Sequence, residues 1–191
     1  MTIDRLYHSI MLALQRTGTR RGNYLRKHRL FHQIGQNVSI QSRKIPLYPE
    51  LISIHNNVHI ASGVTFITHD ISYRMLNAAP QTAGKGYMET VGCIEIMDNV
   101  FIGAGTTILY NVRIGENVIV AAGSVVTKDL PSGGIYAGVP ARRIESMEEY
   151  LEKLGKKTPY PAELRPSGQK VSPGLEEYMW KVFQNEKEAT E

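Results

Sequence analysis

Residues 96–131 read, in groups of six, IMDNVF, IGAGTT, ILYNVR, IGENVI, VAAGSV and VTKDLP. Isoleucine or valine opens every group, and a small or β-branched residue fills the fifth place in five of the six. A fixed short period of this kind is typical of a solenoid. It fits neither the 3.6-residue turn of a helix nor the alternation of a strand. The pattern predicts a triangular coil with three short faces per turn, inward-pointing aliphatic residues and strand-like stacking between turns.

The same period extends toward the N-terminus with two interruptions. Further groups of six begin at Ile34, Ile40, Ile54, Ile60 and Phe66. Residues 42–51 break the period and are expected to bulge from a corner of the coil. Residues 70–90 break it again, and a long loop that leaves a regular solenoid is more often functional than structural.

Three regions are therefore expected. Residues 1–33 form an N-terminal helical, basic segment in which Leu6, Ile10 and Leu14 share one apolar stripe. Residues 34–134 form the coil with its protruding loop 70–90. Residues 135–191 contain a turn and C-terminal helices, one over 145–157 and another that begins with Ser172 as its N-cap and Pro173 at its first position.

Composition narrows the possible functions. The net charge of +4 suits an anionic ligand without requiring nucleic acid, and no nucleic-acid partner is expected. No apolar run is long enough for a transmembrane helix, and no secretion signal is recognised. The single cysteine, Cys93, rules out an internal disulfide framework and fits a reducing compartment, so a cytoplasmic location is expected.

The basic residues between Arg20 and Arg29 leave two interpretations open. They can form a solvated helical cap on the open end of the solenoid. Alternatively, they can form a patch for weak association with a membrane surface or an anionic glycolipid.

Two motifs and the repeat resemble the hexapeptide-repeat acyltransferases, whose fold is a left-handed parallel β-helix. The first motif is TFITHD at 65–70, where the coil meets the loop. The second is VVTKDLP at 125–131, followed by AGVPAR at 137–142. Over roughly residues 34–144 the chain is similar to the maltose and galactoside O-acetyltransferase group, and TFITHD is closest to the acetyltransferases of capsule and lipopolysaccharide sugars. The resemblance implies an all-β solenoid of left-handed sense, which is an exception to the usual right-handed crossover. It also implies acetyl-CoA as cosubstrate and a homotrimer with sites between subunits.

The resemblance implies that His69 is the catalytic base. Acetyl transfer from a thioester to a hydroxyl requires removal of the hydroxyl proton, which an imidazole of pKa about 6.5 can accept near neutral pH. Asp70 is predicted to orient the second ring nitrogen, with Glu89 and Glu95 as alternatives.

The same resemblance implies that the second motif contains the residues that bind the donor. Thr127, Lys128 and Arg142 are expected at the nucleotide end of acetyl-CoA, and backbone groups at Ala104 and Ala122 along its pantetheine arm. A lysine point charge and an arginine fork both suit the phosphates of this molecule.

Acceptor contacts are not carried over from the family, because the 42–51 bulge replaces the coil that binds the acceptor in maltose enzymes. Tyr48, Tyr73, Arg74 and Asn77 are plausible contacts, since aromatic faces and amide groups suit a sugar. His55 and His59, four residues apart, lack further ligands in the sequence and are expected to be corner residues rather than a metal pair. No metal is expected, and a three-histidine zinc hydratase is disfavoured because no histidine follows residue 69.

The expected function is acetyl-CoA-dependent O-acetylation of a sugar, or of a precursor of a cell-surface polysaccharide or glycolipid. An N-acetyltransferase of an amino sugar nucleotide, or another small-molecule acetyltransferase, is the alternative. A non-enzymatic scaffold is disfavoured because His69, Lys128 and Arg142 occur together.

Overall fold

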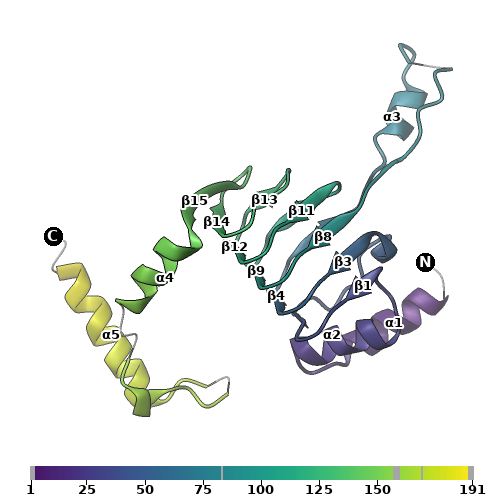
Figure 1. Ribbon diagram of the computed structural model, residues 1–191. Helices are drawn as coiled ribbons and strands as arrows, with labels where there is room; N and C mark the ends of the chain where they lie inside the picture. The colour runs from purple at the N-terminus through teal and green to yellow at the C-terminus, as the bar shows by residue number, and fades with distance from the viewer. Residues whose placement is uncertain (1–2, 83, 157–159, 169, 189–191) are drawn as a thin grey trace. The chain divides into compact units, whose positions relative to one another are not determined.

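Short parallel strands in three sheets form the central part of the protein, shown in Figure 1 as a computed structural model. The structure describes residues 3–82, 84–156, 160–168 and 170–188. The chain divides into two units, residues 1–150 and residues 151–191, which are described separately.

Each sheet contains the strands of one face of the coil. The first contains β1 (Gln33–Ile34), β3 (Ile52–Ile54), β8 (Ile94–Ile96) and β11 (Val112–Ile114). The second contains β5 (Thr65–Ile67), β10 (Thr107–Leu109) and β13 (Val125–Val126). The third contains β2 (Ser39–Ile40), β4 (Val58–Ile60), β9 (Val100–Ile102), β12 (Val118–Val120), β14 (Gly134–Ala137) and the antiparallel β15 (Arg142–Ser146).

The register of these strands follows the six-residue period. Val100 pairs with Val118, eighteen residues later, which is one turn of three six-residue groups. Ile60 pairs with Ile102, forty-two residues later, because the loop is inserted between them. The prediction of stacked parallel strands at period six is therefore confirmed, and the insertion leaves the stacking in register.

The residues that open the groups form the core. All six openers between residues 96 and 126 are 0% exposed: Ile96, Ile102, Ile108, Ile114, Val120 and Val126. Full burial of one such side chain stabilises the fold by about 1.5–3 kcal/mol.

A ladder of asparagines runs along one corner of the coil. The Nδ2 atom of Asn37 donates to Oδ1 of Asn57 (2.6 Å), Asn57 donates to Asn99 (2.8 Å), and Asn99 donates to Asn117 (3.1 Å). All four have positive φ, between 53° and 60°, a conformation that asparagine tolerates better than most residues. The ladder therefore fixes the same tight corner in successive turns.

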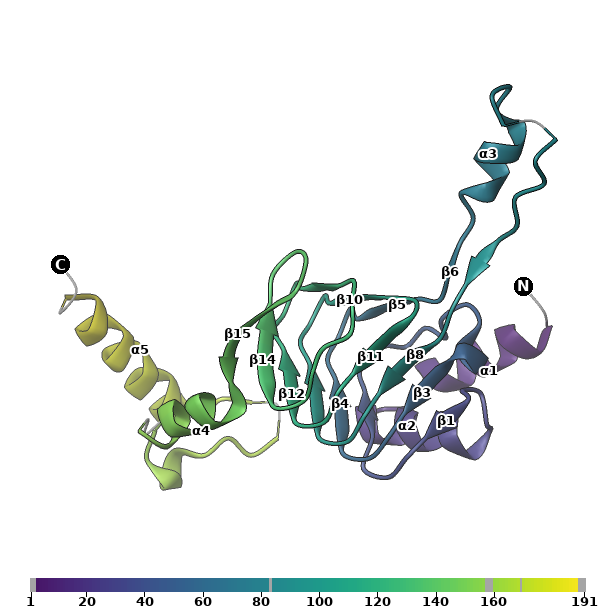
Figure 2. The same ribbon diagram turned by 45° about the horizontal axis from the view of Figure 1, so that its top comes forward.

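Two helices, α1 (Ile3–Ala13) and α2 (Gly18–Lys27), cover the N-terminal end of the coil (Figure 2). Helix α2 lies so close to β2 that a Cβ atom on Gly22 would sit 2.2 Å from the Val38 carbonyl oxygen. Arg21 is buried, and its guanidinium donates at 2.7 Å to the carbonyl oxygens of Gln15 and Ile40 and to the Gln41 side chain. One residue of the predicted basic patch is thus a structural part of the cap.

The predicted stripe of α1 does not pack on the protein. Leu6, Ile10 and Leu14 are exposed, and the buried residue of the helix is Leu12. Hydrophobic spacing identifies an apolar side of a helix but not what covers it.

Residues 70–82 and 84–90 form an arm that projects away from the coil in both ribbon views (Figures 1 and 2). Its root is an antiparallel pair, β6 (His69–Asp70) and β7 (Thr90–Val91), and it carries α3 (Tyr73–Ala78). The Asn77 side chain donates to the Tyr87 carbonyl (2.8 Å) and accepts from the Tyr87 N–H (2.9 Å). These two bonds clamp the sides of the arm together.

The C-terminal region contains α4 (Met147–Gly155), a short 3-10 turn, η2 (Ala162–Leu164), and α5 (Pro173–Glu188). The Leu175 N–H donates to the Ser172 hydroxyl (3.2 Å), so the predicted N-cap of the last helix is confirmed. The predicted helix over 145–157 begins slightly later because residues 145–146 end β15, and Lys157 lies outside the described residues.

Candidate functional site

The root of the arm is anchored through Thr68, which directly precedes His69. The buried Thr68 hydroxyl donates to the Leu47 carbonyl (2.7 Å), and its own carbonyl accepts from the Gly92 N–H (2.9 Å). The bulge at 42–51 and the returning side of the arm therefore both meet the chain immediately before His69.

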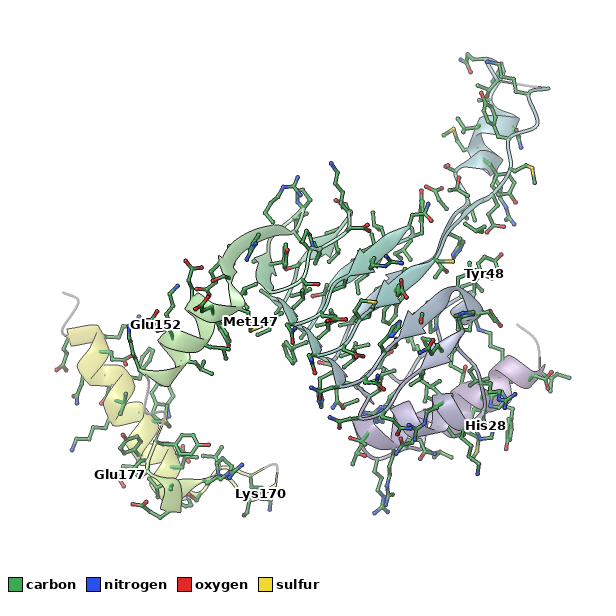
Figure 3. The ribbon with its side chains drawn as sticks, viewed as in Figure 1. His28, Tyr48, Met147, Glu152, Lys170 and Glu177 are labelled. Carbon is green, nitrogen blue, oxygen red and sulfur yellow. The ribbon has the colours of Figure 1, made fainter. Side chains whose placement is uncertain are left out.

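Tyr48, from this bulge, lies against His69. The two rings are in edge-to-face contact, with centroids 5.2 Å apart at an interplanar angle of 72°. Tyr48 precedes η1 (Pro49–Leu51), is labelled in Figure 3, and has a left-handed backbone with φ 50°, which is uncommon for a bulky residue. Its hydroxyl donates to Glu89 on the arm at 3.2 Å.

Tyr73 and Arg74, at the start of α3, extend this group, which we call the arm-root cluster: His69, Tyr48, Glu89, Tyr73 and Arg74. The Arg74 Nε atom donates to the Tyr73 hydroxyl (3.3 Å), and this bond is the main cause of a raised Arg74 pKa. The negative charge of Glu89 is the main cause of a raised Tyr48 pKa. Tyr48 thus contacts the imidazole directly, and the charged groups of the arm act on Tyr48.

Asp70 does not have the predicted role of orienting His69. Its Oδ1 atom accepts from the Ser72 N–H (2.6 Å), and this bond is the main cause of a lowered Asp70 pKa. Among the residues that the structure describes, the buried Nδ1 atom of His69 has no hydrogen-bond partner. The prediction was wrong because successive side chains of a strand point to opposite sides.

The two alternative acids also have other partners. Glu89 bonds Tyr48, as described above. Glu95 lies in the first sheet, where its carboxylate accepts from Arg113 Nε (2.7 Å) and lies 3.1 Å from His55 Nε2. The bond from Arg113 is the main cause of a lowered Glu95 pKa, and His55 adds to it.

Replacing Glu95 by glutamine is expected to lower the free energy of unfolding by about 0.5 kcal/mol at neutral pH, the usual size for a partly exposed ion pair. Because the pKa of Glu95 is lowered in the folded protein, its contribution is present above the unfolded-state pKa. It is lost as the pH falls through the folded-state pKa, so the two proteins should become equally stable in acid. Urea titrations at neutral and acidic pH measure the difference, and a difference that grew in acid would contradict the assignment.

His55 and His59 do not form a metal pair in the structure. His55 contacts Glu95, and His59 is exposed on β4. Within the described ranges, no three histidine, cysteine, aspartate or glutamate side chains are placed to hold a metal ion together. Asn77 is occupied in its clamp with Tyr87, so its amide is not presented to an acceptor.

Small residues lie before the first residues of β10 and β13 in the second sheet, whereas His69 follows the last residue of β5. Ala104–Gly105 and Ala122–Gly123 form turns at equivalent places in successive coils, and the Gly123 N–H donates to the Ala104 carbonyl (2.8 Å). Both glycines have positive φ, about 70°, and face open space. Both alanines are exposed, so the turns offer backbone groups along a surface without large side chains.

The turn between β14 and β15 is fixed to β13 by two hydrogen bonds. The Val125 N–H donates to the Gly138 carbonyl (3.0 Å), and the Ala141 N–H donates to the Val125 carbonyl (2.8 Å). Thr127, Lys128 and Arg142 follow these anchored positions closely, and all three are exposed. The structure therefore gathers the predicted nucleotide-binding residues at the last turn of the coil.

His69 and the two alanine turns lie at opposite edges of the second sheet, because His69 follows β5 whereas the turns precede β10 and β13. Three residues of strand span roughly 10 Å between these edges. A single chain thus presents the candidate base and the alanine turns separately.

Comparison with known proteins identifies the family to which this chain belongs. Residues 94–128 match the family described as "Bacterial transferase hexapeptide (six repeats)". The chain is 34% identical over 139 residues to "Putative acetyltransferase YvoF" of Bacillus subtilis (strain 168), an alignment that covers 70% of this chain and 72% of that protein. The chain belongs to the hexapeptide-repeat acetyltransferase family. It is accordingly an acyltransferase.

Two solved structures of this family have similar folds. A maltose O-acetyltransferase from Clostridium difficile 630 is 25% identical, with a TM-score of 0.52 over 75% of this chain and 87% of that chain. A hexapeptide-repeat acetyltransferase from Vibrio cholerae, complexed with acetyl coenzyme A, is 24% identical, with a TM-score of 0.51 over 74% of this chain and 84% of that chain. The second likeness concerns the fold alone.

Sequence reasoning named Tyr48 only as a plausible acceptor contact and missed its packing against His69. The two residues are twenty-one positions apart: Tyr48 lies within the first interruption of the repeat, and His69 directly precedes the second. The available signal was that both interruptions occur in neighbouring turns, so their roots had to lie close together.

Proposed function

We propose that this acetyltransferase transfers the acetyl group of acetyl-CoA to a hydroxyl group of a sugar, or of a precursor of a cell-surface polysaccharide or glycolipid. The observation that carries the proposal is the position of His69 at the arm root, in ring contact with Tyr48, whose hydroxyl donates to Glu89. Tyrosine rings and a carboxylate–arginine set suit the faces and hydroxyls of a sugar. The likeness to a maltose O-acetyltransferase supports the same acceptor class.

In the proposed reaction, His69 takes the proton of the acceptor hydroxyl as its oxygen attacks the thioester carbonyl. Because Nδ1 is buried, Nε2 is the nitrogen that accepts this proton. The tetrahedral intermediate collapses with cleavage of the C–S bond, and the imidazolium returns the proton to the leaving thiolate. Backbone N–H groups stabilise the oxyanion.

The donor is proposed to lie along the alanine turns, with its phosphates at Thr127, Lys128 and Arg142. Since these turns and His69 occupy opposite edges of a sheet, a neighbouring subunit of a homotrimer would complete each site. The arm supports this arrangement because Ile71, Met75 and Met88 are exposed on it in the single chain. A left-handed sense of the coil and a cytoplasmic location belong to the same proposal.

The Lys128→Ala/Arg142→Ala variant is expected to bind acetyl-CoA at least about tenfold more weakly, because charge-assisted bonds to phosphate contribute about 1.5–3 kcal/mol each. Isothermal calorimetry measures this change. The Arg20→Ala/Lys27→Ala variant removes two exposed charges of α2, at the N-terminal end of the coil, and serves as the matched control. Equal weakening in both variants, or none in either, would contradict the donor site.

Acceptor class is tested by release of CoA in the presence of sugars that offer only hydroxyl groups or an additional amino group. An O-acetyl product is an ester that mild alkali cleaves, whereas an N-acetyl product is an amide that survives. Turnover confined to amino sugars, with an alkali-stable product, would replace the proposal by N-acetylation.

Tyr48 is expected to act as a positioning residue for His69. Tyr48→Leu removes the ring contact and should lower kcat roughly tenfold, whereas Tyr48→Phe keeps the ring and should lower it less. The comparison of kcat and KM with a good acceptor measures this, and kcat should change more than KM for acetyl-CoA. An equal loss in both variants would assign the effect to the hydroxyl and its bond with Glu89 instead.

A further inference from the structure

Helix α1 turns polar residues toward the protein. Arg5 donates to the Ile45 carbonyl (3.0 Å), and the Nδ1 atom of His8 lies 2.7 Å from the Tyr24 hydroxyl. Leu12 is the buried apolar residue of the helix. The side that packs on the fold is therefore largely occupied by polar contacts.

The outward side, together with the residue that directly follows the helix, forms what we call the α1 apolar face: Ile3, Leu6, Tyr7, Ile10 and Leu14. Their exposed fractions run from 45% for Leu6 to 87% for Ile3. The helix thus reverses the usual order of a surface helix, which buries its apolar side and exposes its polar side. A contiguous exposed apolar patch of this kind indicates an interaction surface.

Exposed cations follow helix α1 and lie beside its middle. Arg16 follows the last apolar residue by two positions. Beside the middle of the helix, the His28 ring lies 5.2 Å from the His8 ring, and the neighbouring Lys27 and Arg29 are exposed. Residues 1–33 contain seven lysines and arginines against one aspartate, whereas the whole chain has 22 against 18 acidic residues. The cationic excess of the chain is therefore concentrated in the N-terminal segment that contains this face.

We propose that the α1 apolar face docks on the surface of an anionic phospholipid bilayer. The helix would lie in the plane of the interface, its apolar residues among the upper acyl chains and the flanking cations at the headgroups. Tyr7 suits this depth because its ring is apolar and its hydroxyl polar. A second copy of the chain docked face to face is a poorer occupant, since two such faces would bring clusters of like charge together. In the described part of the chain, no helix has the length and apolar character needed to cross a bilayer.

The test is co-sedimentation of the full-length chain with vesicles of phosphatidylcholine alone and of equal parts phosphatidylcholine and phosphatidylglycerol. The unaltered protein is expected to sediment with the anionic vesicles and to dissociate as salt is raised. The Ile10→Ser/Leu14→Ser variant should lower the affinity roughly tenfold because two apolar side chains no longer enter the bilayer. The Leu151→Ser/Leu154→Ser variant makes the same kind of change on exposed residues of α4 and should bind normally.

Light scattering and circular dichroism of each variant accompany the binding measurement. Retained fold and oligomeric state, together with lost vesicle binding, support the proposal. Failure of the unaltered protein to bind anionic vesicles would overturn it, as would equal binding to both vesicle types. A changed oligomeric state in Ile10→Ser/Leu14→Ser, but not in the α4 control, would assign the face to a contact between subunits and would also overturn it.

Discussion

Replacing His69 by alanine is expected to lower turnover by about 10²–10⁴-fold, the usual contribution of a general base. Affinity for acetyl-CoA should remain nearly unchanged, because the proposed donor contacts are made by Thr127, Lys128, Arg142 and the alanine turns and not by the His69 side chain. Release of CoA in the presence of a sugar acceptor measures the first quantity. Calorimetry with acetyl-CoA measures the second.

His59→Ala is the matched control for this experiment, because His59 is exposed on β4 and belongs to no proposed site. Its turnover should equal that of the unaltered protein. Parallel losses of turnover and donor affinity in His69→Ala would indicate a structural role for His69. A comparable loss of turnover in His59→Ala would show that the effect is not specific to His69, and the assignment of His69 as the base would fail.

The Ile60→Ala variant is expected to lower the free energy of unfolding by about 2–5 kcal/mol, the range for truncating a buried isoleucine. Ile60 is 1% exposed and opens one group of six, and its strand partners are Ile40 and Ile102. A cavity at this position interrupts the continuous column of aliphatic residues. Urea unfolding, followed by circular dichroism at a fixed protein concentration, measures the loss.

His59→Ala again supplies the control, because His59 precedes Ile60 on the same strand and points to the outside. Its effect on unfolding should stay within about 0.5 kcal/mol, as expected for a surface substitution. Similar losses in the two variants would mean that burial does not alternate along β4, contrary to the structure.

The coil could be predicted because its core requires a buried aliphatic residue at every sixth position. This period is directly visible in the sequence. Ile102 and Ile108 open their groups and are fully buried as expected. The last helix was similarly predictable, because Ser172 caps it locally. Such features depend on short stretches of chain.

The site could not be predicted in this way, because it depends on contacts between residues that are far apart in the sequence. Tyr48 meets His69 only because two interruptions of the repeat leave neighbouring turns, and Asp70 turns away to bond Ser72. The exposed side of α1 was also beyond prediction from periodicity, because the polar bonds of Arg5 and His8 decide which side packs inward.

The arm leaves the coil at His69 and returns at Val91 through one antiparallel pair, while Asn57 and Asn99 on either side of it remain hydrogen-bonded. The stacking of the coil therefore does not depend on the length or the sequence of the arm. The arm can therefore be lengthened, shortened or exchanged without altering the hydrogen bonds that stack the coil. Under the proposed function, such an exchange would alter the contacts to the acceptor and leave the stability of the coil unchanged.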